Sequence, residues 1–521
     1  MHIVVADPLS PSALDVLRLP GWTIDARGGR AASDLARDLV EADALVVRSA
    51  TQVTGDLLSA APRLRLVARA GTGVDNVDVP AATARGIVVV NAPGANSISV
   101  AEHAIGLMLA LARSVPAADA AMKKGVWDKK RLTGVELRGK VLGIIGLGRI
   151  GREVAARARA FGMEVVAHDP FIPARAAADV PLLALDDLLA RADYLTLHVP
   201  STPETHHLLD AARLGCCKRG VRIVNTARGD LVDEPALIDA IGAGVVAGAG
   251  LDVFETEPPI DRRLVDLAQV IATPHISAST VEAQEQVGQE IAACVRDYLR
   301  DGIIRNAVNF PTIPADAFAR VRPFLALADR LGALASQLLR GRPESLGVRY
   351  YGPVPSAHED VLGSAVIAGA LRGVTAGVTV VNARAAAAAR GLEVVESRSS
   401  RRREFANMLS VKLRDGAGER WVEGPVFEDG SARLHTLQGV PVEAPLSGTL
   451  LVIDNEDQPG VIGDVGTALA RHGVNIATFA LGRGEDGAVG VINVDAAPGL
   501  DAAVDAIRAL PSIRDARVAR L

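Results

Sequence analysis

Aromatic residues are scarce in this chain of 521 residues, at 3%, although 49% of the residues are hydrophobic. The buried cores must therefore be built from Ala, Val, Leu and Ile. Only three cysteines are present, and two of them, Cys216 and Cys217, are adjacent. This number and spacing argue against a disulfide framework and against a cysteine-based metal site, so we expect no bound metal and a reducing, cytoplasmic setting.

Strong charge and long apolar runs are also absent. The net charge is −5 and the arginines are scattered, which argues against a nucleic-acid surface. No run of about 18 apolar residues lacks a charged or polar break, so we predict no membrane span. The chain starts directly with an apolar strand and has no basic leader, so we expect no signal peptide.

A glycine-rich segment, GKVLGIIGLGRIG at 139–151, is the feature around which the chain is organised. Its apolar half predicts a buried parallel strand, and the residues after it predict a helix. Gly146, Gly148 and Gly151 have the G-x-G-x-x-G spacing. These glycines allow a tight turn, the approach of a pyrophosphate to the backbone, and close packing of the helix on the strand.

Asp169 ends the next predicted strand, roughly 20 residues after the glycines, as a dinucleotide site requires. Its carboxylate can accept hydrogen bonds from ribose hydroxyls and would repel a 2′-phosphate. We therefore predict NAD rather than NADP as the cofactor. The alternative is a merely tight turn between strand and helix, which the flanking strand, helix and acid disfavour.

The order of the predicted elements indicates an α/β protein of several domains. Strands and helices alternate over 2–92 and again over 139–275, which predicts two doubly wound parallel sheets. Residues 407–440 predict an antiparallel sheet, and 448–521 has the βαββαβ order of a ferredoxin-like fold. The predicted domains are 1–93 together with 276–310, then 94–275, 311–447 and 448–521.

Three strand ends of the second unit carry an arginine, a glutamate and a histidine: Arg228, Glu257 and His275. Histidine suits proton abstraction near neutral pH, and a nearby carboxylate fixes its tautomer. An arginine fork suits a substrate carboxylate. Each residue alone has a structural explanation, but together, after a dinucleotide motif, they favour a dehydrogenase.

Two arginines, Arg48 and Arg69, end neighbouring strands of the first unit, the second of them before a glycine loop. An anion site and a pair of surface ion pairs explain them equally well by position alone. Trp127 lies in a basic loop, and we interpret it as a subunit contact or as a plug in the core rather than as part of the chemistry.

With these motifs, residues 1–310 resemble the D-isomer-specific 2-hydroxyacid dehydrogenases, and the whole chain resembles the long, phosphoglycerate-oxidising branch of that family. The matched motifs are Val-Arg48-Ser-Ala-Thr, Arg69-Ala-Gly-Thr-Gly-Val-Asp-Asn76, Gly146–Gly151, Thr226-Ala-Arg228-Gly and Pro274-His275. The resemblance implies a flavodoxin-like substrate domain, a Rossmann NAD domain, an α+β intervening domain and a ferredoxin-like ACT domain.

The resemblance also implies roles for individual residues. The family's catalytic positions fall on Arg228, Glu257 and His275. Its substrate-binding positions fall on Arg48, Arg69, Asn96 and Lys129. Its cofactor-binding positions fall on Thr72, Gly146, Gly148, Arg149, Ile150, Gly151, Asp169, Thr226, Ala227, Asp252 and Ser277.

Regulation is implied for the last two domains. The ACT domain of the family binds L-serine between two chains, at positions that match Asp457 and Asn475, while Asn455 replaces the usual Tyr or His. In the intervening domain Arg433 matches a basic effector position, and Pro445 stands where another basic residue is expected. The resemblance further implies a homo-oligomer, either a dimer or a tetramer.

The resemblance therefore predicts NAD-dependent oxidation of 3-phospho-D-glycerate to 3-phosphohydroxypyruvate, the first step of L-serine biosynthesis, with possible feedback by serine. Two alternatives stay open. Another D-2-hydroxyacid dehydrogenase, acting on glycerate or hydroxypyruvate, would share Arg228, Glu257 and His275. A non-catalytic protein that senses NAD would have no need of them.

Overall fold

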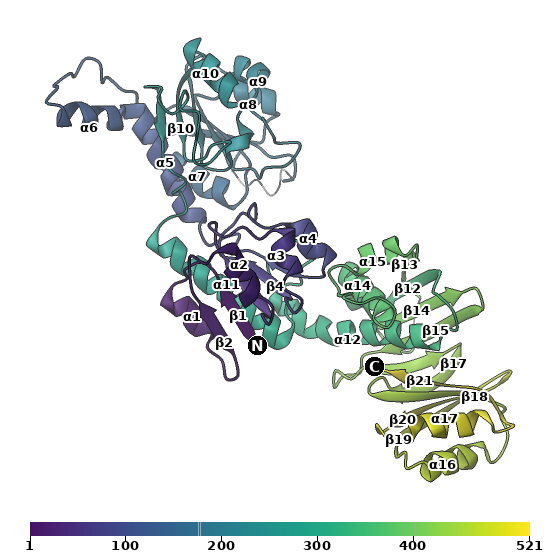
Figure 1. The fold of residues 1–521 in the computed structure, drawn as a ribbon. Coiled ribbons are helices and arrows are strands. Elements are labelled where there is room, and N and C mark those ends of the chain that lie inside the picture. The colour runs from purple at the N-terminus through teal and green to yellow at the C-terminus, as the bar shows by residue number, and fades with distance from the viewer. Residues whose placement is uncertain (174, 176, 178, 402) are drawn as a thin grey trace. The chain divides into compact units, whose positions relative to one another are not determined.

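The computed structural model describes residues 1–521 except 174, 176, 178 and 402 (Figure 1). The chain forms two compact units. The first comprises Met1–Pro8, Asp15–Asn91 and Ile291–Leu521, and the second comprises Leu9–Leu14 and Ala92–Glu290.

A five-stranded parallel sheet opens the first unit. Its strands lie in the order β2-β1-β3-β4-β5, the flavodoxin-like arrangement, so the predicted class is confirmed. The strands are β1 (His2–Val5), β2 (Thr23–Ala26), β3 (Ala44–Val47), β4 (Leu66–Arg69) and β5 (Val88–Val90). The helices between them are α1 (Pro11–Leu17), α2 (Ala32–Asp38), α3 (Gly55–Ser59) and α4 (Val79–Ala84).

The chain returns to this sheet after the long helix α11 (Val281–Asp301). Ala307 forms a bridge with Val90 of β5, and the Asn309 side chain accepts the Val89 N–H at 2.9 Å. Residues distant in sequence therefore complete the first sheet. The domain boundaries given above stay predictions.

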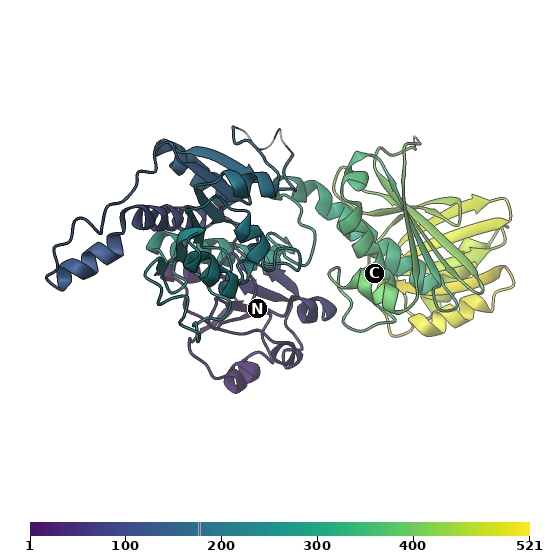
Figure 2. The same cartoon turned by 90° about the horizontal axis from the view of Figure 1, so that it is seen from above.

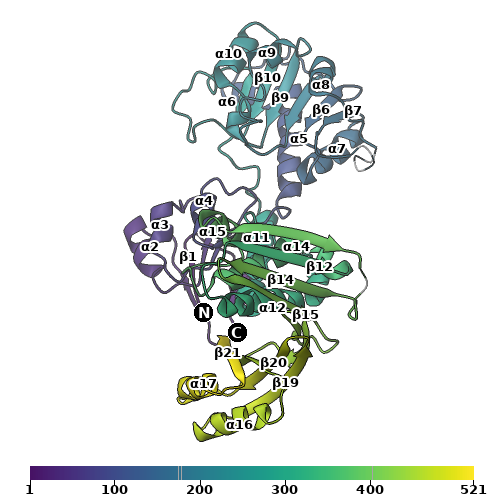
Figure 3. The same ribbon diagram turned by 90° about the vertical axis from the view of Figure 1, so that its right-hand side faces the viewer.

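A six-stranded parallel sheet forms the core of the second unit (Figure 3), with the strand order β11-β10-β9-β8-β6-β7. Helices α5 and α7 share one buried cluster on the sheet, and α8, α9 and α10 share the other, so the sheet is covered on both faces. The strands are β6 (Val141–Ile145), β7 (Glu164–His168), β8 (Tyr194–Leu197), β9 (Val221–Asn225), β10 (Val246–Leu251) and β11 (Val270–Ala272). The helices are α5 (Ser97–Arg113), α7 (Arg149–Ala160), α8 (Leu185–Arg191), α9 (Ala211–Gly215) and α10 (Glu234–Gly242).

The helix α6 (Val115–Lys123) was not predicted from the sequence. It is separated from α5 by Ser114 in a left-handed conformation (φ 50°), and none of its residues is buried. The loop after it carries Trp127, whose side chain is 73% exposed. The interpretation of Trp127 as a plug in the core is therefore wrong for this chain, because most of this residue is accessible to solvent; a subunit contact stays a prediction.

The intervening domain combines a mixed sheet with a layer of helices. Strands β12 and β13 pair in parallel, and the remaining neighbours pair antiparallel, in the order β13-β12-β14-β15-β16-β17. The strands are β12 (Ser345–Tyr351), β13 (Glu393–Ser399), β14 (Met408–Asp415), β15 (Gly418–Pro425), β16 (Arg433–Leu437) and β17 (Val440–Pro445). The helices are α12 (Ala315–Leu338), α13 (Pro353–Ala357), α14 (Glu359–Leu371) and α15 (Ala383–Ala389).

The last domain has the predicted βαββαβ order, with the strands arranged β19-β20-β18-β21. Its elements are β18 (Thr449–Asn455), α16 (Val461–Arg471), β19 (Ile476–Gly484), β20 (Gly487–Val494), α17 (Leu500–Arg508) and β21 (Ile513–Arg520). Helices α16 and α17 cover one face of the sheet. The opposite face contributes Leu450, Val452 and Val491 to the core of the intervening domain, which lies beside it in Figure 2.

Among the described residues, no single helix is both long enough and apolar enough to cross a membrane. Helices α5 and α6 meet that criterion only when taken together, and they meet at a bend of 63°.

Helices α12 and α14 cross at two glycines. A methyl group at Gly369 would lie 2.0 Å from the carbonyl oxygen of Asp329, and one at Gly332 would lie 2.1 Å from that of Val366. Because the obstacle is backbone, it cannot rotate away, and the helices would have to separate.

We therefore expect Gly369→Ala to destabilise the chain by about 2 kcal/mol, the usual cost of overpacking. The matched control is Gly466→Ala in α16, where a methyl group meets nothing within 4 Å, and alanine should stabilise by up to about 1 kcal/mol. Urea unfolding of both variants measures the difference. Equal stability of the two would contradict the observed crossing.

Candidate active site

His275 and Glu257 form a hydrogen-bonded pair where β10 and β11 end. His275 Nδ1 lies 2.7 Å from Glu257 Oε2, and the backbone N–H of Phe254 donates to Glu257 Oε1 at 3.2 Å. Both side chains are partly exposed. The glutamate is therefore held in place by its own loop while its other oxygen is hydrogen-bonded to the imidazole.

In this pair the pKa of each group is shifted in the direction that favours its charged form. The hydrogen bond to Glu257 raises the pKa of His275 above 6.5 and outweighs the opposing effect of burial, while the nearby charge of Arg228 acts in the other direction. Burial raises the pKa of Glu257, but the hydrogen bond and the charge of His275, together with the Phe254 N–H, outweigh it, and the net shift is downward from 4.5. An ionised Glu257 can only accept, so neutral His275 carries its proton on Nδ1 and has its lone pair on Nε2.

Asp252 fixes the backbone that leads into His275. This fully buried carboxylate accepts the N–H groups of Ile276 at 2.9 Å and Ser277 at 2.8 Å. The hydroxyl of Thr273 donates to it at 2.5 Å, and His103 Nε2 lies 3.5 Å away. Burial raises the pKa of Asp252, yet these donors together depress it strongly, so the group stays ionised.

Arg228 extends from a turn that Asn225 holds at the end of β9. The Asn225 side chain donates to the carbonyl of Arg228 at 2.7 Å and accepts the N–H of Ala227 at 3.0 Å. A methyl group at Gly229 would lie 1.9 Å from the backbone of Phe254. The absence of a side chain at this glycine therefore lets the arginine turn pack directly against the loop that carries Glu257.

The three glycines of the β6–α7 turn have the geometry that a dinucleotide site requires. Gly146 is left-handed (φ 95°), and a methyl group at Gly151 would lie 2.2 Å from its carbonyl oxygen. A methyl group at Gly148, by contrast, would meet nothing within 4 Å. The backbone at the start of α7, which begins at Arg149, is therefore open to an approaching phosphate.

Two polar groups near this turn also fit NAD. Asp169 accepts the N–H of Leu147 at 2.9 Å and that of Phe171 at 3.0 Å, and its oxygens keep lone pairs for ribose hydroxyls. The buried hydroxyl of Thr226 has no hydrogen-bond partner among the described residues. A bound group with a donor or acceptor would satisfy it, so the residues present fit the cofactor.

The first sheet positions the predicted phosphate contacts. Arg48 follows β3, and Arg69 is the last residue of β4. A methyl group at Gly71 would lie 1.6 Å from a guanidinium nitrogen of Arg69, so this arginine folds over the glycine loop that contains Thr72. These residues belong to the first unit, whereas the His275–Glu257 pair belongs to the second.

Asn96 and Lys129, the other two predicted substrate positions, lie in different surroundings. Asn96 is buried immediately before α5. Lys129 is exposed, with its ammonium nitrogen 5.6 Å from the centre of the Trp127 ring. The described residues place Lys129 in no hydrogen bond or ion pair.

The three predicted effector positions of the ACT domain are already engaged within this chain. Asp457 Oδ1 lies 3.3 Å from the Arg483 Nε, and the Asn475 side chain donates to Asp495 at 2.8 Å. Asn455 is buried and donates to the carbonyl of Glu456 at 2.8 Å, whereas its Oδ1 has no partner among the described residues.

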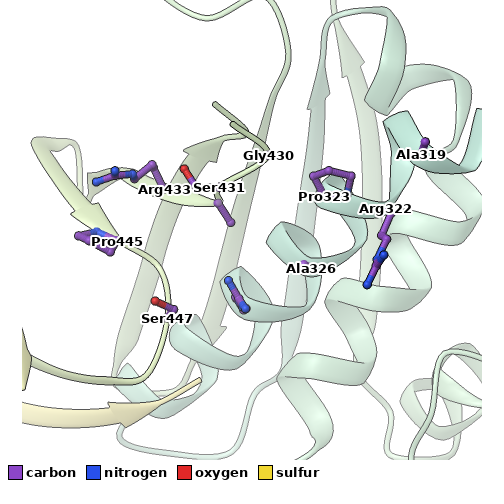
Figure 4. Close-up of a pocket in the computed structure, with 11 residues that line it drawn as sticks. Ala319, Arg322, Pro323, Ala326, Gly430, Ser431, Arg433, Pro445 and Ser447 are labelled. Carbon is purple, nitrogen blue, oxygen red and sulfur yellow. The ribbon is translucent and has the colours of Figure 1, made fainter. Parts of the chain in front are cut away.

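A basic pocket of about 550 Å³ lies between α12 and the start of β16 in the intervening domain (Figure 4). Arg322 and Arg330 line it from the helix, and Arg433 lines it from the sheet. Arg433 Nε and Ser431 Oγ are buried there without hydrogen-bond partners among the described residues. Pro445 also lines the pocket, so the two effector positions noted from the sequence lie together.

The sequence analysis missed residues that hold the candidate groups in place. Asn225 and Thr273 each stand immediately before a quoted motif, so their positions gave a signal. His103 lies in α5, 149 positions before Asp252, and nothing in its local sequence points to this partner.

Comparison with known protein families matched three segments of the chain. The family model for the D-isomer specific 2-hydroxyacid dehydrogenase NAD binding domain matches residues 105–277. The D-3-phosphoglycerate dehydrogenase intervening domain matches 320–438, and the ACT domain matches 449–512.

Relatives of similar length were found as well. A D-3-phosphoglycerate dehydrogenase of Methanocaldococcus jannaschii is 40% identical over 528 residues, covering 100% of both chains. One from Mycobacterium tuberculosis is 44% identical and covers 93% of this chain and 92% of its own. Among solved structures, a D-lactate dehydrogenase of Aquifex aeolicus complexed with NAD and lactic acid is 30% identical, with a TM-score of 0.53 over 60% of this chain and 100% of that one.

The electrostatics of the pair can be measured directly. We expect His275 to titrate above 6.5, and Glu257→Gln to lower that pKa, because the acceptor loses its charge. By linkage, the raised pKa contributes stability that is present below 6.5 and is lost as the pH rises through the folded value.

NMR titration of histidine-labelled protein measures the shift, with a His275→Gln variant to assign the signal. Glu255→Gln is the control, because that carboxylate pairs with His207 instead, 2.8 Å away. A His275 pKa that is unchanged in Glu257→Gln would contradict the pairing.

Proposed function

The chain belongs to the D-3-phosphoglycerate dehydrogenase family, and on this premise we propose that it oxidises 3-phospho-D-glycerate to 3-phosphohydroxypyruvate with NAD, the first step of L-serine biosynthesis. The observation that carries the proposal is the 2.7 Å hydrogen bond between His275 and Glu257, with the charge of Arg228 close by.

The substrate would be held by its two charged ends. Arg48 and Arg69 would donate charge-assisted hydrogen bonds to the phosphate, and the Arg228 fork would bind the carboxylate. Asn96 and Lys129 would add polar contacts. An arginine on the carboxylate also polarises the neighbouring C2 centre, because it stabilises the charge that develops on the oxygen.

The reaction requires a base for the C2 hydroxyl. His275 Nε2 would take the hydroxyl proton while the C2 hydrogen departs with its electron pair, and Glu257 would stabilise the imidazolium that forms. Bound NAD supplies the hydride acceptor. Asp169 would hold its ribose, and the start of α7 would hold its pyrophosphate, with the remaining cofactor-binding positions around them.

Oxidation of an unphosphorylated 2-hydroxyacid by a related enzyme activity has less support, because such a substrate has no phosphate for Arg48 and Arg69 to bind. A non-catalytic protein that senses NAD has less support still, since it would have no use for the His275–Glu257 pair. We also propose the cytoplasm as the location and a homo-oligomer as the assembled state, in line with the family.

NADH formation from 3-phospho-D-glycerate tests the function. We expect turnover with NAD, and we expect His275→Ala to lower kcat by about 10²–10⁴, the contribution of a positioned acid–base group, while NADH still binds. His206→Ala, which alters an exposed histidine of the same unit, is the control. A His275→Ala variant that retains normal turnover would refute the role of the histidine, and greater activity on D-glycerate would favour the sibling enzymes.

Regulation is proposed for the two C-terminal domains. The pocket between α12 and β16 would bind an anionic effector, because three arginines line it. L-serine would bind at the Asp457 turn of the ACT domain, where the carboxylate of Asp457 suits an amino group. Because Arg483 already pairs with Asp457, the ligand would have to displace or share this arginine.

Calorimetry with L-serine tests this second site. We expect binding and inhibition in the unmodified protein and the loss of both in Asp457→Ala, with the basal activity retained. Asp464→Ala, in the first turn of α16, is the control. Absence of heat and of inhibition at millimolar serine would mean that this ACT domain serves assembly or another ligand.

A further inference from the structure

Two buried polar side chains of the first sheet, Asp7 and Asn76, have no role in the account so far. Asp7 follows β1 and is 6% exposed, and Asn76 ends the loop that begins at Arg69 and is 9% exposed. No ion pair to Asp7 is present among the described residues. A buried carboxylate without a cation must be compensated by hydrogen bonds.

The hydrogen bonds that compensate the charge of Asp7 come from the turn that carries Arg48. Its Oδ2 accepts the backbone N–H of Arg48 at 2.6 Å and that of Thr51 at 3.3 Å. Its Oδ1 accepts the hydroxyl of Thr51 at 2.9 Å. The donors at both ends of the four-residue turn are thus fixed by a single carboxylate.

Asn76 binds the acceptors of the same turn. Its Nδ2 donates to the carbonyl of Arg48 and to that of Thr51, each at 2.6 Å. An amide has two such hydrogens, so both are used. The backbone of Asn76 also accepts the N–H of Val53 at 2.8 Å.

Together the two residues close a clamp around the turn. The N–H and C=O groups of Arg48 and Thr51 are all satisfied, while Ser49 and Ala50 at the tip stay exposed. Because Asn76 belongs to the loop after Arg69, the clamp also ties the loop after β4 to the turn after β3. The positions of the two arginines are therefore coupled.

The coupling between the positions of Arg48 and Arg69 affects how well they can bind a phosphate dianion. Two guanidinium groups bind one phosphate well only when their spacing is fixed beforehand, since ordering them at binding would cost entropy. We propose that Asp7 and Asn76 are positioning residues that set the spacing of Arg48 and Arg69, and that they thereby determine how strongly the enzyme prefers a phosphorylated substrate. The proposal rests on the proposed function.

The test is the ratio of kcat/KM for 3-phospho-D-glycerate to kcat/KM for D-glycerate, together with the KM for NAD. Asn76→Ala removes both amide donors and should lower the ratio about tenfold, which corresponds to two weakened hydrogen bonds. Thr51→Val removes one hydroxyl at nearly constant volume and should lower it about threefold. The KM for NAD should stay unchanged in both variants.

Two further variants separate positioning from stability. Thr51→Ser keeps the hydroxyl and should restore the ratio. Asp43→Asn is the matched control, because Asp43 is 7% exposed and accepts the His2 N–H at 2.7 Å in the same sheet, away from both arginines. This variant should lower the melting temperature without changing the ratio.

The outcomes distinguish the two proposals. An enzyme that prefers the phosphorylated substrate, and whose Asn76→Ala and Thr51→Val variants keep the full ratio, overturns the positioning role alone. An unmodified enzyme with no preference for the phosphorylated substrate overturns the proposed function and this inference with it. If Asn76→Ala fails to fold, Thr51→Val and its Thr51→Ser rescue decide the matter.

Discussion

Backbone N–H groups at the carboxyl ends of parallel strands need acceptors, because the ladder that would satisfy them has ended. Three carboxylates provide them here. Asp7 accepts an N–H group of the turn after β3. Asp169 accepts the N–H groups of Leu147, in the β6–α7 turn, and of Phe171. Asp252 accepts the N–H groups of the two residues after His275. The turn that carries Arg48, the glycine motif and the residues that follow His275 each depend on such a bond.

His275 illustrates how this constraint reaches the chemistry. Its backbone is left-handed (φ 51°), which is unusual for a residue with a side chain, and its N–H is held by the carbonyl oxygen of Asp252 at 2.9 Å. Asp252 is itself held by Thr273 and the N–H groups that follow. The strained residue is thus maintained by its surroundings, and its imidazole meets Glu257 with a defined nitrogen.

Much of this arrangement could be predicted from the sequence, because the decisive signals are local. Buried strands produce apolar runs, and the glycine spacing marks the turn that follows β6. The sequence did not reveal β2, which is short and lies at a sheet edge, or α6, which buries nothing. It also did not reveal the crossing at Gly332 and Gly369 or the pairing of His103 with Asp252, since these depend on partners distant in the chain.

A crystal structure of the enzyme with NADH and 3-phospho-D-glycerate tests the central claim most directly. The account predicts the phosphate on Arg48 and Arg69, the carboxylate on Arg228, and the C2 hydroxyl within hydrogen-bond distance of His275 Nε2. It also predicts that the turn at Arg48 keeps its bonds to Asp7 and Asn76. A substrate phosphate bound elsewhere, or a C2 hydroxyl that faces away from His275, would contradict the account.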